Sequence, residues 1–398
     1  MRLNAPHARS RVTEPGALRS ALIPGLLVLA ALNLSVGIWQ SVQGATTSDL
    51  RQMVAWTGDW LYGGNPYAAI EGGVDYPPWA IVILSPLALM PPILQAPLWI
   101  GANMTLVFAL AYRLAWHTGE PAPVRVALML LLGSTAAAHT LTQFSLVSYA
   151  LAMAGVLSPS RFAAAVAVGL ALMKPQIGGI ALIFLLFSRQ WTKAALALVV
   201  PAVLTMVFAV RGGVEVVTLL AQYLRILTDV YAGADSFHGH TELRHWLERW
   251  PAAGTLAFAA ALGALLLLPA LVASVRRRRW TPDEMLECLG LCGAASLLAV
   301  RHLSYDFILL WPVVIAWRTS PFAAGRRRHA PASAFWVLAS VLVIGIPGWI
   351  RAAVVAGAPP ALLPLTEMDR LVAVGAWGYL AWRVIARRSG VNYWHQTG

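Results

Sequence analysis

Long apolar runs recur along the whole chain, and they constrain its fold more than any other feature. They begin at residues 21–39 and return as far as residues 371–386, and roughly 20 apolar residues can cross about 30 Å of hydrocarbon as a helix. Of the 398 residues, 12% are charged and 59% are hydrophobic, whereas a soluble domain has about 25% charged residues. The sequence therefore predicts an all-α, polytopic membrane protein, with residues 1–398 forming a single integral membrane domain.

The order of apolar and basic segments predicts how the chain is oriented. Cytoplasmic loops are enriched in Lys and Arg, and the basic clusters here, such as residues 276–279 and 326–328, lie between apolar runs. If the short run 79–90 lies in the interface without crossing, about 12 spans remain and most of the 29 basic residues face the cytoplasm. The expected spans include residues 126–141, 144–157, 177–187, 305–317 and 334–352. If the run 79–90 crosses, this bias inverts. We therefore expect a multi-pass protein of the cell (plasma) membrane with both termini in the cytoplasm.

Several functional classes are disfavoured by the sequence. The net charge is +12, but no basic face exists apart from the spans to bind nucleic acid. Cys288 and Cys292 lie four residues apart in an apolar run, and we expect them to pack rather than form a disulfide or a zinc site. The chain has no phosphate-binding loop, dinucleotide-binding motif or Asp-x-Asp. These absences disfavour nucleotide hydrolysis and the direct use of a nucleotide sugar, and we expect no cofactor.

Two long polar segments are expected on the extracytoplasmic side. Residues 40–96 form the first external loop, with juxtamembrane helices, and residues 211–250 form the second. The first loop concentrates carboxylates in a chain that has few of them: Asp49, Asp59, Glu71 and Asp75. In the second loop, His238-x-His240 has the type and spacing of metal ligands, but zinc needs three or four ligands that converge. We expect an acceptor-binding loop that contains His240, and no metal site.

Three polar breaks between later apolar runs fall on the same side, and they hold Gln143, the string Lys174-Pro-Gln176, and the cluster from Arg301 to Asp306. The ammonium of Lys174 would cost about 2.5 to 3.5 kcal/mol if left alone at the bilayer centre. It therefore needs an anionic partner, which is either the carboxylate of a structural ion pair or the phosphate of a substrate. Snorkelling of the side chain to the surface is a third possibility.

Asp49 is the candidate base, because it lies shortly after the first span at the start of an amphipathic segment. Ser48 or Asp49 could equally serve as the cap of that helix. The segment continues into Tyr62-Gly-Gly-Asn-Pro-Tyr67 and then Tyr76-Pro-Pro. This series resembles the opening of the GT87 (DUF2029) family of GT-C fold glycosyltransferases, and the resemblance implies a GT-C-like bundle of transmembrane helices.

The resemblance also implies roles for individual residues. Asp49 matches the catalytic carboxylate of the family's first external loop, and Lys174-Pro-Gln176 is similar to the family's pattern at an equivalent break. The family commonly has a His followed by a Tyr-Asp pair, which His302, Tyr305 and Asp306 match. The donor phosphate is then expected at Lys174, Arg301 and His302, with Asp306 orienting His302 or Arg301. The remaining residues are expected to support the site or bind substrate: Tyr305, Gln176, Tyr67, Tyr76, Gln143 and His240.

The activity implied by the resemblance is that of an inverting membrane glycosyltransferase. It would move a sugar, usually mannose, from a polyprenyl-phosphate carrier to a glycolipid or polysaccharide acceptor on the extracytoplasmic side, among membrane lipid. An arabinofuranose carried on polyprenyl phosphate would fit the same pattern. A transporter or lipid flippase is the alternative from another class, although transporters usually contain inverted repeats, and no repeat is visible in this sequence.

Overall fold

The computed structural model describes residues 48–68, 74–117, 142–232, 255–276, 280, 282–300, 306, 309, 310 and 368–386, together with five single positions between 28 and 39. The elements found in these residues are α-helices, as the composition predicts. In chain order they are α2 (Ser48–Leu61), α3 (Pro78–Ala88), α4 (Pro92–His117), α6 (Phe144–Leu157), α7 (Arg161–Ala171), α8 (Pro175–Phe187), α9 (Trp191–Gly212), α10 (Val216–Ala232), α11 (Leu256–Arg276), α12 (Pro282–Ala299) and α16 (Met368–Ala386).

The helices follow the apolar runs of the sequence. Three of those described are long and apolar enough to cross a membrane, namely the segments Pro92–Leu110, Trp191–Gly212 and Ala257–Val275. The run 79–90 forms α3, whose 11 residues extend about 16 Å, roughly half of the hydrocarbon thickness. α7 is equally short, so the length does not decide whether the run crosses, and the expectation that it does not cross stays a prediction. The spans expected at 126–141 and 334–352, and most of that at 305–317, lie outside the described residues.

The segment 211–250, which the sequence predicts to be a second external loop, contains a helix that its polarity did not predict. α10 begins at Val216 and buries Leu219, Tyr223 and Ile226, which are spaced four and three residues apart and so share one helix face. That face joins an apolar cluster with α2, α3 and α9. Residues 211–250 are therefore not loop throughout: 216–232 form an amphipathic helix packed on α9.

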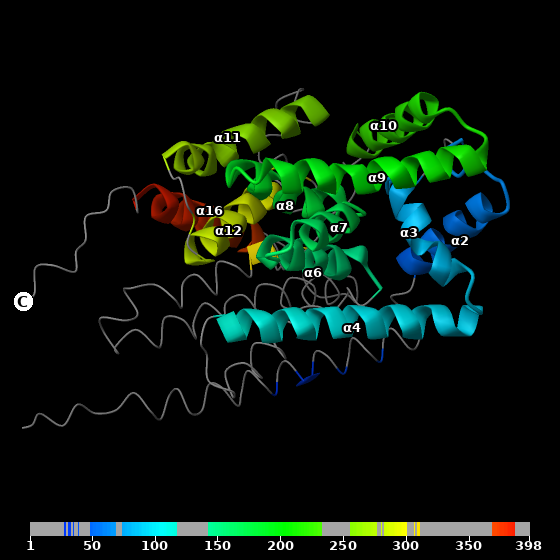
Figure 1. The fold of residues 1–398 in the computed structure, drawn as a ribbon, viewed down its shortest axis with the longest axis horizontal. Helices are drawn as coiled ribbons and strands as arrows, with labels where there is room; N and C mark the ends of the chain where they lie inside the picture. The colour runs from blue at the N-terminus through cyan, green and yellow to red at the C-terminus, as the bar shows by residue number, and fades with distance from the viewer. Residues whose placement is uncertain are drawn as a thin grey trace, which may run out of the picture.

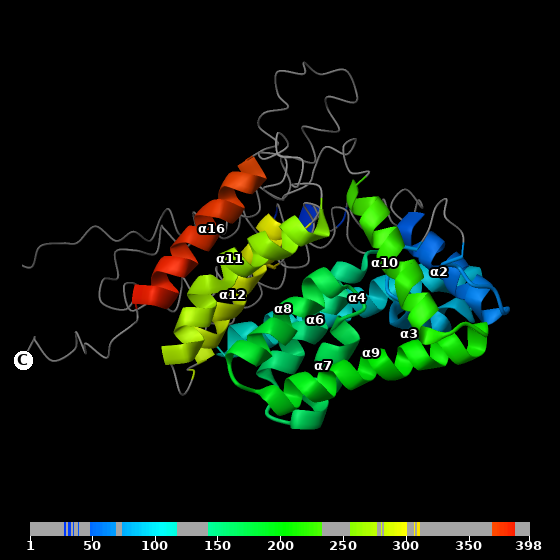
Figure 2. The same cartoon turned by 90° about the horizontal axis from the view of Figure 1, so that it is seen from above.

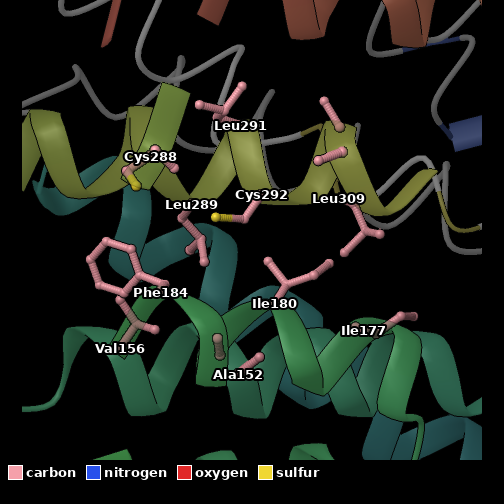
Figure 3. Packing of buried hydrophobic residues seen from close by; sticks show 14 of the residues in the cluster. Ala152, Val156, Ile177, Ile180, Phe184, Cys288, Leu289, Leu291, Cys292 and Leu309 are labelled. Carbon is pink, nitrogen blue, oxygen red and sulfur yellow. The ribbon is translucent and has the colours of Figure 1, made fainter. Parts of the chain in front are cut away.

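The described residues pack around two apolar clusters. In the larger, Leu289 and Cys292 of α12 face Ile180 and Phe184 of α8 (Figure 3). The smaller cluster joins α2, α3, α9 and α10. Of these, α2, α3 and α10 lie at one end of α9, with α12 and α16 toward the other end (Figures 1 and 2). α6 contributes to both clusters, because Phe144 belongs to the smaller one and the larger begins on this helix two residues later. The beginning of α6 therefore lies where the two clusters meet.

The turn from α7 to α8, which carries Lys174, is held from three sides. The indole Nε1 of Trp79 donates to the carbonyl of Leu172 at 2.8 Å, and the Oγ of Ser148 donates to the carbonyl of Ala171 at 2.5 Å. Gly178 lets α8 approach this turn, because a Cβ at that position would lie 2.3 Å from the carbonyl oxygen of Ala171. These contacts fix where α8 begins and hence where Lys174 lies.

Candidate active site

The N-terminal ends of four helices meet at one place. Asp49 lies in the first turn of α2, Tyr76 lies two residues before α3, Gln143 is the N-cap of α6 and Lys174 is the N-cap of α8. The Nε2 of Gln143 donates to the Oδ2 of Asp49, and the Tyr76 ring packs on Phe144 with centroids 5.1 Å apart. Asp49, Tyr76 and Lys174 each contact a residue at the beginning of α6, so the four helix ends form a single site.

Lys174 lies in a buried cluster with Ser145 and Asp306. Its Nζ donates to Asp306 Oδ1 at 3.0 Å and to Asp306 Oδ2 at 3.3 Å, and the two side chains are only 4% and 2% exposed. The Oγ of Ser145 donates to Asp306 Oδ1 at 2.6 Å and accepts from Lys174 Nζ at 2.5 Å. The sequence therefore correctly predicted that Lys174 has an anionic partner, and in this structure the partner is a carboxylate.

The close approach of Lys174 to Ser145 does not make a nucleophilic pair. A lysine that activates a serine must be neutral in order to accept the hydroxyl proton. Here Lys174 Nζ is the donor to Ser145 Oγ, and the Ser145 hydroxyl donates in turn to Asp306 Oδ1. Ser145 therefore serves to bridge the ion pair, and the cluster supplies a fixed, nearly neutral electrostatic unit at the base of the site.

Asp49 lies in a different setting from Asp306, because it remains half-exposed while Asp306 is buried. α2 buries Leu50, Met53 and Trp60 on its inner face, which holds the helix against α3 and α9. The amide of Gln143 orients the Asp49 carboxylate. A carboxylate that is oriented and also accessible can take a proton from a molecule that enters the site.

The phenol of Tyr76 lies between the two halves of the site. Burial raises the pKa of Tyr76 well above its ordinary value, and the carboxylates of Asp75, Asp49 and Asp306 raise it further. Asp49 and Asp306 therefore both lie near the same phenol, although they are far apart in the sequence. The Tyr76 backbone carbonyl accepts a hydrogen bond of 2.7 Å from the hydroxyl of Tyr67.

Tyr67 supports the first loop from within. It is 3% exposed, and its ring meets Phe208 and Tyr223 edge-on at 5.5 and 6.1 Å. Burial raises the pKa of Tyr67 well above its ordinary value, with smaller contributions from Tyr223 and Asp75. Because its hydroxyl is already bonded to the Tyr76 carbonyl, Tyr67 positions Tyr76.

The structure brings together Asp49, Gln143, Tyr76, Lys174 and Asp306 from the residues proposed on the sequence. Gln176 lies in the first turn of α8, where its backbone carbonyl accepts from Ser296 of α12 at 2.9 Å. Ser145 was not proposed, although it lies only two residues after Gln143, in the first turn of α6. The other proposed residues lie outside the described part of the chain: Arg301, His302, Tyr305 and His240.

The described side chains do not form a metal site. Within residues that the structure describes, no three His, Cys, Asp or Glu side chains gather as they would around a metal ion. The arrangement that is present combines an accessible carboxylate, a buried ion pair and several helix N-termini. It can accept a proton at one point and stabilise negative charge at another.

A family model decides between the functional classes. The model of glycosyltransferase family 87 matches residues 75–300, more than half of the chain. The chain belongs to this family. The resemblance seen in the first loop is thereby confirmed, and glycosyltransferase activity is favoured over a transporter or flippase. No curated protein and no solved structure matches the chain.

The match places the site within a family 87 glycosyltransferase. The matched residues include Tyr76, Gln143, Ser145 and Lys174, whereas Asp49 precedes them and Asp306 follows them. A family 87 glycosyltransferase requires a sugar donor and an acceptor, and the long apolar helices are those of a membrane protein. The match itself assigns no catalytic role to Asp49 or Asp306, so their roles depend on the geometry.

Proposed function

We propose that this family 87 protein transfers a sugar from a polyprenyl-phosphate carrier to a hydroxyl of a glycolipid or polysaccharide, with inversion, on the extracytoplasmic side of the membrane. One observation carries the proposal. Asp49 is accessible and oriented by Gln143, and two residues further along the chain Ser145 binds the buried pair of Lys174 and Asp306. An accessible carboxylate and a buried ion pair thus lie close together in a membrane glycosyltransferase, which supports the proposal.

Asp49 acts as the general base in this mechanism. The acceptor hydroxyl gives its proton to the Asp49 carboxylate while its oxygen forms a bond to the anomeric carbon of the sugar. The bond from that carbon to the phosphate oxygen breaks on the opposite face, and the phosphate takes the electron pair. Because attack and departure occur on opposite faces, the anomeric configuration inverts, and no covalent bond to the protein is required.

Negative charge increases on the phosphate as it leaves, so the site must stabilise that charge. Lys174 is already paired with Asp306, and the pair carries no net charge. The N-terminal ends of α6 and α8 each carry a partial positive charge equivalent to about half an elementary charge. The side chains of Gln143 and Lys174 do not cap their own helices, so neither occupies the N–H groups of its helix end. We assign the remaining attraction to Arg301 and His302, and direct contact between Lys174 and the phosphate stays a prediction.

The proposed donor is lipid-linked because the sequence has no nucleotide-binding motif and because the protein has long apolar helices. Mannose is the sugar we propose, with arabinofuranose as the second candidate. Both sugars would be presented on the same type of carrier. They are therefore distinguished by supplying each polyprenyl-phosphate sugar separately to the purified enzyme.

The test compares Asp49→Asn with Asp59→Asn in transfer from purified polyprenyl-phosphate mannose. Both residues lie on α2, but Asp59 is exposed and packs beside Gly64 at the far end of the helix. Loss of a general base lowers the rate by about 10²- to 10⁴-fold, so Asp49→Asn should lose that much kcat and Asp59→Asn should lose little. Undiminished turnover by Asp49→Asn would remove this residue from the mechanism.

A further inference from the structure

The side-chain carbonyl of Gln143 is a buried acceptor. Gln143 is 5% exposed, and among the described residues its Oε1 finds no hydrogen-bond donor, whereas its Nε2 is bonded to Asp49. An ionised carboxylate can only accept hydrogen bonds. The Nε2 of the amide must therefore face Asp49, so Oε1 is directed elsewhere and cannot exchange places with Nε2.

We propose that Gln143 Oε1 accepts a hydrogen bond from a second hydroxyl of the acceptor, next to the hydroxyl that Asp49 deprotonates. Buried polar side-chain atoms in native proteins nearly always have a partner, and one that lacks it beside a catalytic base is completed when substrate binds. Only a donor can satisfy Oε1, which excludes the phosphate. The inference rests on the proposed function and specifies its acceptor as a sugar or other polyol, rather than an isolated alcohol.

The surroundings of Gln143 agree with a sugar subsite. Phe144, the next residue, packs against Tyr76 and against Trp99 with ring centroids 5.1 and 4.9 Å apart. The indole Nε1 of Trp99 is also buried and has no hydrogen-bond partner within the described part of the chain. A polyol offers both donors and acceptors, so it can supply a donor to Gln143 Oε1 and an acceptor to the indole N–H of Trp99, whose ring packs on Phe144.

In this proposal the two polar atoms of the Gln143 side chain have separate roles. Its Nε2 orients Asp49, which affects the rate of the chemical step, and its Oε1 holds the acceptor, which affects acceptor binding. Gln143→Met has a similar length and removes both groups. Gln143→Glu keeps an acceptor oxygen but places a second carboxylate beside Asp49. The two variants should therefore differ in acceptor KM, although both should have a lowered kcat.

The experiment uses full-length enzyme in detergent, labelled polyprenyl-phosphate mannose, and a dilution series of a lipid and glycan extract from membranes of a deletion strain. Gln143→Met should raise the apparent KM for the extract about tenfold, the loss of one hydrogen bond, and leave the donor KM unchanged. Gln143→Glu should keep an acceptor KM near that of the wild type. Gln190→Met is the matched control, because Gln190 bonds to Ser188 beyond the far end of α8.

Two results would contradict the proposal in different ways. If both Gln143 variants lower kcat with an unchanged acceptor KM, Gln143 only orients Asp49 and the subsite does not exist. If the wild-type enzyme incorporates no label from any polyprenyl-phosphate sugar supplied, the proposed function is wrong, and the proposed subsite is wrong with it. Thermal unfolding of each variant, compared with Gln190→Met, separates loss of binding from loss of fold.

Discussion

The buried pair of Lys174 and Asp306 offers the sharpest test of the site. We consider Lys174→Met, Asp306→Asn and the double variant. Met is close to Lys in length and volume, and Asn is close to Asp, so each change removes a charge and leaves the packing almost intact. Each single variant leaves one charge without its partner in a place where the side chains are 4% and 2% exposed. The double variant leaves neither charge.

The expected magnitude follows from the geometry. At the 3.0 Å between Nζ and Oδ1, two unit charges attract by about 5 kcal/mol at an effective dielectric constant of about 20. Breaking a buried pair by removing one partner costs about 3 to 5 kcal/mol, since the other charge stays buried. We expect each single variant to lose that much unfolding free energy. The double variant should lose less than the sum of the two, with a coupling energy of up to about 3 kcal/mol.

The assay is unfolding by titration with sodium dodecyl sulfate, followed by the fluorescence of the 17 tryptophans. Lys193→Met is the matched control, because Lys193 is only half-buried and donates to the carbonyl of Ser158 at 3.1 Å. That variant should lose less than about 1 kcal/mol. The reasoning is refuted if Lys174→Met costs no more than Lys193→Met, or if the costs of the two single variants simply add.

Transfer activity of the double variant then separates the two interpretations of Lys174. If the ammonium binds the donor phosphate, the double variant folds but remains inactive, because the phosphate has lost its ligand. If the pair is structural, the double variant regains transfer, since Met and Asn restore a neutral and packed site. The same three variants therefore test the fold and the role of the lysine with independent measurements.

Two further predictions follow from local geometry. Gly178→Ala should destabilise the protein by about 1 to 3 kcal/mol, because its Cβ would lie 2.3 Å from the Ala171 carbonyl; the adjacent Gly179→Ala meets no atom within 4 Å and should be neutral or stabilising in the same titration. Burial raises the pKa of Tyr67 and of Tyr76, so the stability they contribute is complete below about pH 10, where unfolded tyrosine titrates, and is lost as pH rises through their folded pKa. Tyrosinate absorbance at pH 11 should be the same in Tyr67→Phe and Tyr76→Phe as in the wild type, and a drop would contradict this.

The helices could largely be predicted from apolar runs, and the differences have local causes. Residues 144–157 have the expected bounds. α8 begins two residues earlier than the apolar run at 177, because Pro175 is favourable in the first turn of a helix. α10 was missed because overall polarity outweighed the spacing of Leu219, Tyr223 and Ile226, which is the periodic signal of an amphipathic helix.

The site was predictable in part, and for each residue the part that could not be predicted is the identity of its partner. The cost of an isolated ammonium predicts that Lys174 has an anionic partner, but cost alone does not identify a carboxylate 132 residues away. Asp306 was expected to orient His302 or Arg301, whereas its described partners are Lys174 and Ser145. Gln143 likewise meets Asp49 across 94 residues. Chemistry predicts that a polar group needs a partner, and only the packing of the helices determines which partner it has.

The helix ends that make the site attractive to anions also restrict where the substrate can lie. In the proposed transfer, Asp49 loses negative charge as it takes the proton, and the phosphate gains it. A positive field that acted equally on both would stabilise the reactants as much as the transition state and would not accelerate the reaction. The phosphate must therefore lie nearer to the N-terminal ends of α6 and α8 than Asp49 does, with the sugar between them. Asp49 is hydrogen-bonded to Gln143, the N-cap of α6, whereas the N-cap of α8 is Lys174, which is bonded to Asp306. In the proposed transfer the phosphate is therefore expected at the N-terminal end of α8.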